Sequence, residues 1–231
     1  MMTTLQLRMI KFGGHTLVLD PDRAVHWPEQ RALIVADLHF GKAAIFRQNG
    51  LPVPAGTTAG DLFKLTQLLD RTQASRLLIL GDCFHGYVND PAPMHEQLHL
   101  WRCARPRLTI DLILGNHDRR ANSIPDALSI TVHTAPLDLD GITFAHEPID
   151  GAARPVICGH IHPTASLRDF DGQGVRVPCF VIEQRRMILP AFGRFTGGCA
   201  VAPNHERQLY VAAQGRVIPV PLPRRSAAWR A

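Results

Sequence analysis

The chain has 231 residues, of which 45% are apolar and 19% charged, as in ordinary globular proteins rather than disordered or fibrous ones. Its length suits one large domain, which we place at residues 1–220, followed by a short basic tail at 221–231. No apolar run approaches the ~20 residues of a membrane span, and the first residues contain no long apolar core. We therefore expect neither a membrane span nor a secretory signal.

The formal charge is +5, and only three of the 25 basic residues are lysines. The planar guanidinium group of arginine matches phosphate oxygens, so this composition suits a nucleic-acid partner. A GC-rich coding sequence, which favours arginine codons, explains it equally well. The positive charge supports a polyanionic substrate but does not prove one.

The cysteines argue against a disulfide framework. There are five, which is an odd number, and no two of them form a CxxC pair. A reducing compartment fits this pattern, and we expect a cytoplasmic protein.

Short apolar runs bounded by polar or turn-forming residues recur through the first two thirds of the sequence. Each predicts a buried strand, at 32–36, 77–80, 108–114, 142–145 and 156–158. Two amphipathic segments predict helices at 57–71 and at 94–105, the second ending before Pro106. Strands that alternate with helices predict an α/β fold.

From residue 175 onward, predicted strands follow one another without a convincing helix, at 175–182, 187–189, 209–212 and 216–218. Pro178 lies inside the first of these and predicts an edge strand or a bulge, because proline has no N–H to donate. This region therefore predicts a second sheet packed on the first.

Polar residues cluster directly after five of the predicted strands. These clusters are Asp37 with His39, Asp82 with His85, Asn116 to Asp118, His146, and His160 with His162. Ligands in open α/β sheets bind at the carboxyl ends of the strands, so we expect the five clusters to form one site.

Imidazole, carboxylate and amide groups are metal ligands. The members of each Asp-x-His or His-x-His pair lie on the same face of an extended chain and can reach one ion or two adjacent ions. A single such histidine is more often structural, and the ordered placement of all five clusters indicates the metal site. There are more candidate ligands than one ion takes, so we expect two divalent ions. The seven candidates are Asp37, His39, Asp82, Asn116, His146, His160 and His162.

The five blocks, in this order, resemble the signature of the calcineurin-like metallophosphoesterase superfamily. The resemblance implies a four-layer α/β/β/α sandwich of two mixed sheets flanked by helices. It also implies hydrolysis of a phosphoester, in which two ions hold the attacking and leaving oxygens of an in-line displacement.

The resemblance further implies a role for each position. Asp82 resembles a ligand that bridges the ions. His117 resembles the group that protonates the leaving oxygen, with Asp118 orienting it. The remaining ligands divide into one set for each ion: Asp37, His39 and His162 for the first, and Asn116, His146 and His160 for the second.

A closer resemblance starts at Ala36-Asp-Leu-His-Phe-Gly-Lys-Ala-Ala44 and continues through Phe46-Arg47 and residues 50–57. With the small size and the Gly-Asn-His-Asp-Arg119 block, this stretch is similar to the bacterial ligase-associated DNA damage response endonucleases. The resemblance implies a manganese-dependent phosphodiesterase that acts on DNA beside a DNA ligase and a helicase. Iron and zinc accept the same ligands. The oligomeric state stays open, a homodimer included.

Three further residues, at or beside these blocks, are candidates for substrate binding. Lys42 follows the first ligand pair, and a solvated lysine is an equal alternative. Arg119 directly follows the catalytic block, which favours a contact with phosphate. His85 either lines the cleft or supports a ligand from behind. Cys83 has no task in a two-metal site, and we interpret it as a packing residue.

Three classes of function remain. The basic charge and the closer resemblance favour a nucleic-acid phosphodiesterase or endonuclease. A small-molecule phosphohydrolase, acting on a nucleotide or a nucleotide-lipid such as a UDP-diacylglucosamine-like substrate, is equally compatible with the metal signature. A non-catalytic scaffold predicts eroded ligand positions and ranks last, because all of them are present.

Overall fold

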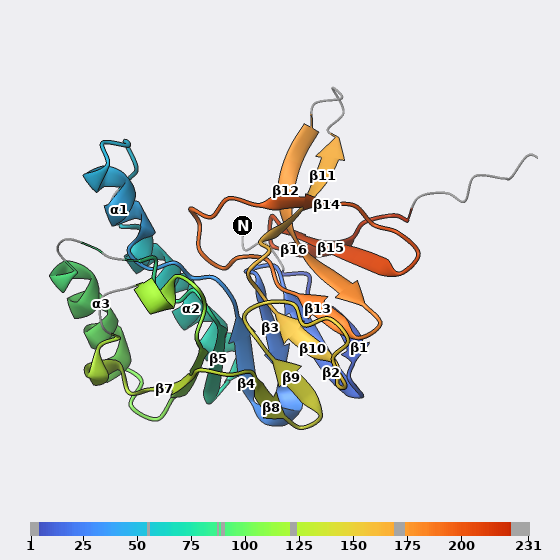
Figure 1. Ribbon diagram of the computed structural model, residues 1–231, viewed down its shortest axis with the longest axis horizontal. Coiled ribbons are helices and arrows are strands. Elements are labelled where there is room, and N and C mark those ends of the chain that lie inside the picture. The colour runs from blue at the N-terminus through green and yellow to red at the C-terminus, as the bar shows by residue number, and fades with distance from the viewer. Residues whose placement is uncertain are drawn as a thin grey trace, which may run out of the picture.

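The computed structural model describes residues 5–222, apart from 55, 87, 89–90, 121–123 and 169–173. Within these residues two mixed sheets pack face to face, and the α-helices lie against the first sheet (Figure 1). The expected α/β fold of two mixed sheets with flanking helices is confirmed. Most of the expected basic tail, from residue 223 on, lies outside the described residues.

The first sheet has seven strands that lie side by side in chain order. Strands β1 to β4 are antiparallel to their neighbours, and β4 to β7 are parallel. The bounds are β1 (Arg8–Phe12), β2 (His15–Asp20), β3 (Ala24–Trp27), β4 (Ala32–Val35), β5 (Arg76–Leu80), β6 (Thr109–Ile113) and β7 (Ile130–His133).

The second sheet has nine strands in the order β14-β11-β12-β13-β10-β9-β8, with β15 pairing both β12 and β16. The bounds are β8 (Leu137–Leu139), β9 (Ile142–Phe144), β10 (Val156–Cys158), β11 (Pro163–Arg168), β12 (Gly174–Glu183), β13 (Arg186–Ile188), β14 (Cys199–Val201), β15 (Arg207–Ala213) and β16 (Arg216–Pro219).

Pro178 sits where β12 changes partners. The first half of β12 pairs with β11, up to Pro178 opposite Thr164, and pairing with β15 begins at Cys179. The sequence predicted an edge strand or a bulge here, and the part of β12 up to Pro178 pairs on one side, with β11, before the strand becomes interior. Proline is tolerated because Pro178 pairs with one neighbouring strand, β11, so its missing N–H interrupts no hydrogen bonding on the other side.

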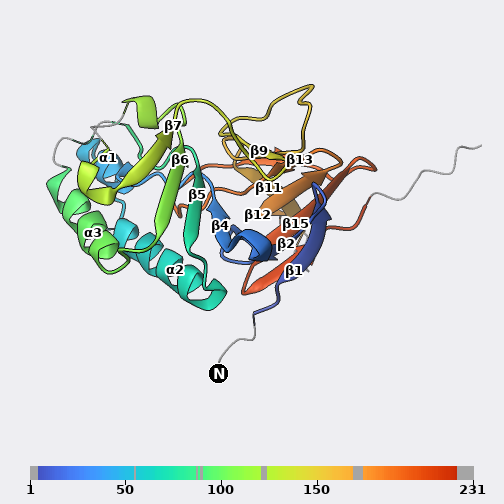
Figure 2. The same cartoon turned by 90° about the horizontal axis from the view of Figure 1, so that it is seen from below.

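Three α-helices and three 3-10 helices complete the described residues: α1 (Lys42–Gln48), α2 (Thr57–Thr72), α3 (Ala92–Cys103), η1 (Pro28–Gln30), η2 (Asp118–Arg120) and η3 (Asp126–Leu128). The α-helices lie on the side of the first sheet that faces away from the second (Figure 2). On the outer face of the second sheet, where the four-layer sandwich implied by the resemblance has its second helical layer, the described residues form no α-helix, and loop residues such as Ile149 and Ala152 pack there instead. None of the described helices is both long and apolar enough to cross a membrane.

The main core lies between the sheets and fixes their separation. Trp27, Phe144 and Phe180 are fully buried there. Burying a large apolar side chain contributes roughly 1.5–3 kcal/mol, so this cluster holds the two sheets firmly against each other. A second core, which includes Leu65 and Leu68 of α2, joins the helices to the first sheet.

The carboxyl ends of five strands meet at one edge of this sandwich. Strands β4, β5 and β6 run parallel in the first sheet, and β9 and β10 run parallel in the second. The chain stays paired beyond β4, because the N–H groups of Asp37 and His39 donate to the carbonyls of Gly81 (3.1 Å) and Asp82 (2.8 Å). These hydrogen bonds bring the polar clusters of neighbouring strands within contact distance.

Candidate metal centre

All seven predicted ligands lie at this edge, in two neighbouring groups. We call one the Asp37 group (Asp37, His39 and His162) and the other the Asn116 group (Asn116, His146 and His160). Asp82 lies between them. The structure brings together the residues that the resemblance assigns to each ion.

The Asp37 group brings three potential ligand atoms together. His162 Nε2 lies 3.2 Å from Asp37 Oδ1 and 3.3 Å from His39 Nε2. Asp37 is fully buried, yet its Oδ1 atom accepts no hydrogen bond. A buried carboxylate oxygen without a donor is costly unless a cation compensates it, so this group fits a bound cation.

The Asn116 group is equally compact. His146 Nε2 lies 3.1 Å from Asn116 Oδ1 and 3.0 Å from His160 Nδ1. The Asp82 carboxylate faces both groups, with Oδ1 3.6 Å from His146 Nε2 and Oδ2 3.9 Å from His39 Nε2. One oxygen therefore points to each group, which is the geometry that a bridging ligand needs.

Hydrogen bonds fix which ring nitrogen of two histidines stays free. His146 Nδ1 lies 3.0 Å from the Leu80 carbonyl, and His162 Nδ1 lies 3.2 Å from the Gly197 carbonyl. A carbonyl only accepts, so each Nδ1 carries the proton and donates it. In the neutral ring Nε2 then keeps its lone pair and faces its group, as in most metal-binding histidines.

Electrostatics also keeps His39 neutral. Burial, with the positive charge of Lys42 and the neighbouring His162, lowers the pKa of His39 to about 2. The ring therefore offers a lone pair at every physiological pH. Imidazole lone pairs, two carboxylates and an amide oxygen that converge in this way suit two divalent cations.

The backbone at this edge is strained. Five of the seven predicted ligands have positive φ angles, between 48° and 68°, a region that non-glycine residues rarely adopt. Each such residue costs on the order of 1–3 kcal/mol, and such strain gathers at functional sites. The five are Asp37, His39, Asp82, His160 and His162.

Two glycines of the sequence blocks allow the loops to approach each other. A Cβ atom on Gly81 would lie 2.2 Å from His146 Nδ1, and one on Gly115 would lie 2.2 Å from Asp82 Oδ1. Both distances are far inside van der Waals contact. The Gly-Asp and Gly-Asn-His blocks therefore need glycine for steric reasons at the site itself.

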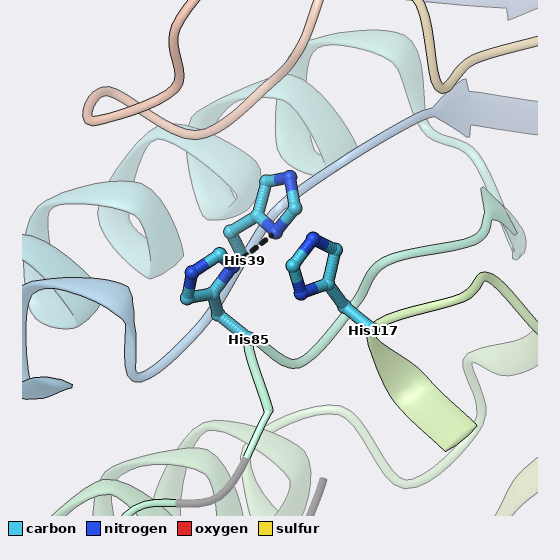
Figure 3. A group of neighbouring side chains, drawn as sticks. All are labelled: His39, His85 and His117. Atoms are coloured by element: carbon cyan, nitrogen blue, oxygen red, sulfur yellow. Dashed lines mark hydrogen bonds between the residues drawn. The ribbon is translucent and has the colours of Figure 1, made fainter. Parts of the chain in front are cut away.

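His85 and His117 form a second layer beside His39 (Figure 3). The rings of His85 and His117 stack, with centroids 4.3 Å apart, and His85 Nδ1 lies 2.9 Å from His39 Nδ1. His85 thus contacts the ring edge of His39 that faces away from His162. Of its two predicted roles, this contact supports the one behind a ligand.

Asp118 is placed differently from the expectation. Its Oδ1 accepts the N–H of Phe84 at 2.8 Å and its Oδ2 accepts the N–H of Gly115 at 3.0 Å. The carboxylate ties together the loops after β5 and β6 and holds the backbone beside His117 rather than the His117 ring. Burial raises the pKa of Asp118 to about 6 despite these two donors.

The flanking residues differ in how they interact with the site. The carboxylates of Asp82 and Asp37 act on Lys42, although burial outweighs them and lowers its pKa. Arg119 is exposed on η2, and the arginine whose charge acts on His117 is its neighbour Arg120. Cys83 is buried in the core between the helices and the first sheet, where burial raises its thiol pKa, as expected for packing.

One supporting segment had no signal in the sequence. The loop at 190–198, between β13 and β14, runs across the site. Its Gly193 N–H donates to the Asp37 carbonyl at 3.2 Å, and its Gly197 carbonyl accepts from His162. No local pattern shows these contacts, because the partners lie far away in the sequence.

The sequence profile of the calcineurin-like phosphoesterases matches residues 30–179, a range that holds every predicted ligand. The chain belongs to this family. Calcineurin-like phosphoesterases are dinuclear metal-dependent hydrolases, and the two groups described above fit that chemistry. No curated protein matches the chain.

Among solved structures, a nuclease from Pseudomonas putida is 38% identical, with a TM-score of 0.81, over 93% of this chain and 100% of the nuclease. A protein of unknown function from Aquifex aeolicus is 20% identical over 57% of this chain and 78% of its own, with a TM-score of 0.37. A phosphoesterase from E. coli is 14% identical over 77% and 86%, also with a TM-score of 0.37.

This calcineurin-like phosphoesterase would hold its ions through the Asp37 group, the Asn116 group and Asp82. When bound, two divalent ions supply Lewis-acid activation of the phosphoryl group and of water. The chain's own residues orient the ligand rings, keep the His39 ring neutral and place His117 beside the centre.

Proposed function

We propose that this metal-dependent phosphoesterase is a phosphodiesterase that cuts DNA as an endonuclease. The observation that carries the proposal is the 38% identity to a nuclease along that protein's whole length. The positive charge and the predominance of arginine support it, since phosphate contacts dominate the affinity for nucleic acids.

In this proposal each site residue has a task. Asp37, His39 and His162 bind one ion, Asn116, His146 and His160 bind the other, and Asp82 bridges them. His117 donates a proton to the leaving oxygen: its ring lies beside His39, with ring centroids 5.1 Å apart, and the family resemblance places it outside the ligand sets. Lys42 contacts the substrate phosphate, since its charge already acts on the carboxylates of the centre.

We further propose that manganese is the working ion, and that the enzyme acts in a cytoplasmic DNA repair system with a ligase and a helicase. The resemblance of residues 36–57 and of the Gly-Asn-His-Asp-Arg119 block to the ligase-associated endonucleases supports both points. Reconstitution of the metal-free protein with manganese, iron or zinc tests the ion. Ligase-dependent sealing of its products and co-purification with the tagged chain test the repair partners.

The function is tested with purified protein and manganese on four substrates: an aryl phosphodiester, a phosphomonoester, and circular single- and double-stranded DNA. We expect cleavage of the diester and of a circular DNA, because only an endonuclease opens a circle. The Asp82→Ala variant, run in parallel, controls for contaminating nuclease. Hydrolysis of the aryl diester or monoester with no cut in either DNA would instead favour the small-molecule phosphohydrolase.

A further inference from the structure

A pocket of about 230 Å³ adjoins the Asp37 group on the side of the 190–198 loop. His162 lines both the pocket and the metal centre. Three arginines from separate parts of the chain meet at the pocket: Arg23 of the β2–β3 turn, Arg176 of β12 and Arg194 of the loop. Among the described residues that line it, none is acidic. The pocket therefore places positive charge directly beside the catalytic centre.

The three arginines are held differently. Arg23 donates from Nη1 to the carbonyls of Ala191 and Gly193, both at 3.3 Å, and so supports the loop. Arg176 is exposed on its strand. The Arg194 side chain is 60% exposed, and its Nε lies 3.8 Å from Asp61 Oδ1, beyond hydrogen-bond distance. Arg176 and Arg194 thus retain guanidinium donors for an external anion.

Nearby carboxylates neutralise only part of the positive charge of this arginine cluster. Asp61 is buried beside Arg194, and the charges of Lys64, Arg194 and Arg23 all act on it. Asp22 also acts on Arg23 and Lys64, so two carboxylates face these three cations, and Arg176 adds a fourth cation to the pocket lining. An arginine cluster that is not neutralised binds phosphate oxygens well, because each guanidinium group can donate two parallel hydrogen bonds.

The size of the pocket limits what it binds. Pockets for whole small-molecule ligands span about 300–1,000 Å³, and this one is smaller. Gly197 and Gly198 form part of its wall next to His162, so no side chain there separates a bound group from the centre. A phosphate with part of its sugar fits these dimensions better than a complete nucleotide.

We propose that this pocket binds the phosphate next to the scissile phosphodiester of a nucleic-acid strand, with Arg176 and Arg194 as its ligands. The proposal rests on the nuclease function proposed above. A strand carries a phosphate at every nucleotide, so a strand cut at the metal centre presents a second phosphate nearby. A diester with a single phosphate has nothing to place there.

Trinucleotides with two linkages test this contact. One linkage is a natural phosphodiester and the other a neutral methylphosphonate, placed on the 5′ or the 3′ side of the cleavable bond. We expect one of these two isomers to lower kcat/KM about tenfold in the wild type, the size of one charge-assisted contact. In Arg194→Gln and Arg176→Gln, kcat/KM for the all-phosphate trinucleotide falls by a similar factor, and the neutral linkage adds little further loss.

Two controls isolate the pocket. Arg107→Gln removes an exposed arginine just before β6, at the opposite end of the strands, and should leave every substrate unchanged. The aryl phosphodiester should be cleaved by Arg176→Gln and Arg194→Gln within about twofold of the wild-type rate, which also shows that both variants are folded. Full additivity of the arginine and linkage effects would overturn the subsite.

A binding measurement separates this proposal from the nuclease function. Affinity for a labelled single-stranded oligonucleotide is measured in EDTA, where metal ions do not contribute. Weaker binding by both arginine variants, together with a flatter salt dependence, supports the subsite even if the wild type cuts no DNA. DNA cleavage by the wild type, with unchanged affinity and kinetics in both variants, overturns the subsite and leaves the nuclease function in place.

Discussion

The two halves of the metal centre are supported in different ways. The Asn116 group rests on strand ends: His146 donates to the Leu80 carbonyl of β5, and Gly81 leaves room for its ring. The Asp37 group is completed by the 190–198 loop, through Gly193 and Gly197, and by the side chain of His85. Strand-end contacts thus hold the Asn116 group, whereas the Asp37 group combines the pairing of Asp37 and His39 beyond β4 with long-range loop contacts.

This difference suggests that the two ion positions respond differently to changes away from the ligands. Strand ends inside a sheet open only with the sheet, whereas a loop can shift without unfolding the domain. The loop also lies outside residues 30–179, the range that the family profile matches. The Asp37 group is therefore where we expect this chain's own sequence to tune ion affinity.

The largest predicted effect comes from a residue that faces both groups, so it should be the same for both ion positions. Asp82→Ala removes the one carboxylate that faces both groups, so we expect both ions to be lost and turnover to fall on the order of 10³-fold or more. Metal content and hydrolysis of an aryl diester measure this. Asp70→Ala, at a site with a 68% exposed side chain, is the matched control. Normal turnover in Asp82→Ala would contradict a bridging role.

His117→Ala separates catalysis from ion binding. His117 lies outside both groups, so the variant should keep both ions and lose roughly 10²–10⁴-fold in kcat, the usual contribution of a general acid. His205→Ala, at an exposed position, controls for the loss of an imidazole. Loss of an ion in His117→Ala would show that His117 is a ligand, and it would then have to be added to one of the two groups.

Gly193→Ala tests the loop support directly. An added Cβ would lie 2.3 Å from the Leu38 carbonyl oxygen, so the loop must move away from Asp37. We expect one ion to bind about 10–100-fold more weakly, as when a group that orients a ligand is lost, and the other to bind normally. Gly197→Ala, in the same loop, meets no atom within 4 Å and is the control. If both ions bound more weakly by the same factor, the loop would not support the Asp37 group in particular.

The smallest effect concerns Lys64, which donates from Nζ to the Phe192 carbonyl of the same loop at 2.7 Å. Burial lowers the pKa of Lys64 from 10.5 to about 8. Between these values the unfolded chain binds more protons than the native one, so the unfolding free energy contributed by this group rises with pH. The rise is at most about 1.4 kcal/mol per pH unit.

Urea unfolding of the wild type and of Lys64→Met at pH 8, 9 and 10 measures this rise as a difference between the two proteins. Lys11→Met, at an exposed lysine, controls for the loss of charge alone. A difference that stays constant across this range would show that Lys64 keeps its ordinary pKa.

Much of the fold followed from local sequence patterns. The buried runs gave β4, β5, β6, β9 and β10 to within about two residues, and α2 and α3 were placed with similar accuracy. The strands β1 to β3 were not predicted. Strand β1 is exposed at most of its positions, so it has no apolar alternation to detect.

In the site, too, only the residues that belong to a local sequence pattern could be predicted. The ligands could be predicted because each follows a buried strand in a short motif, and parallel strand ends meet in space. The groups that support them could not. Arg23 contacts a loop 170 residues away at Gly193, and His162 depends on Gly197, 35 residues on. Asp118 was expected to orient a ring and instead joins two loops, since only the folded structure shows which donors surround it.

We predict that Asp82 joins two ions in one centre. The most direct measurement is the electron paramagnetic resonance spectrum of the manganese-loaded protein, with metal content determined on the same sample. We expect two ions per chain and a spin-coupled signal that Asp82→Ala abolishes. One ion per chain in a fully active protein, or two ions with uncoupled spectra, would contradict it.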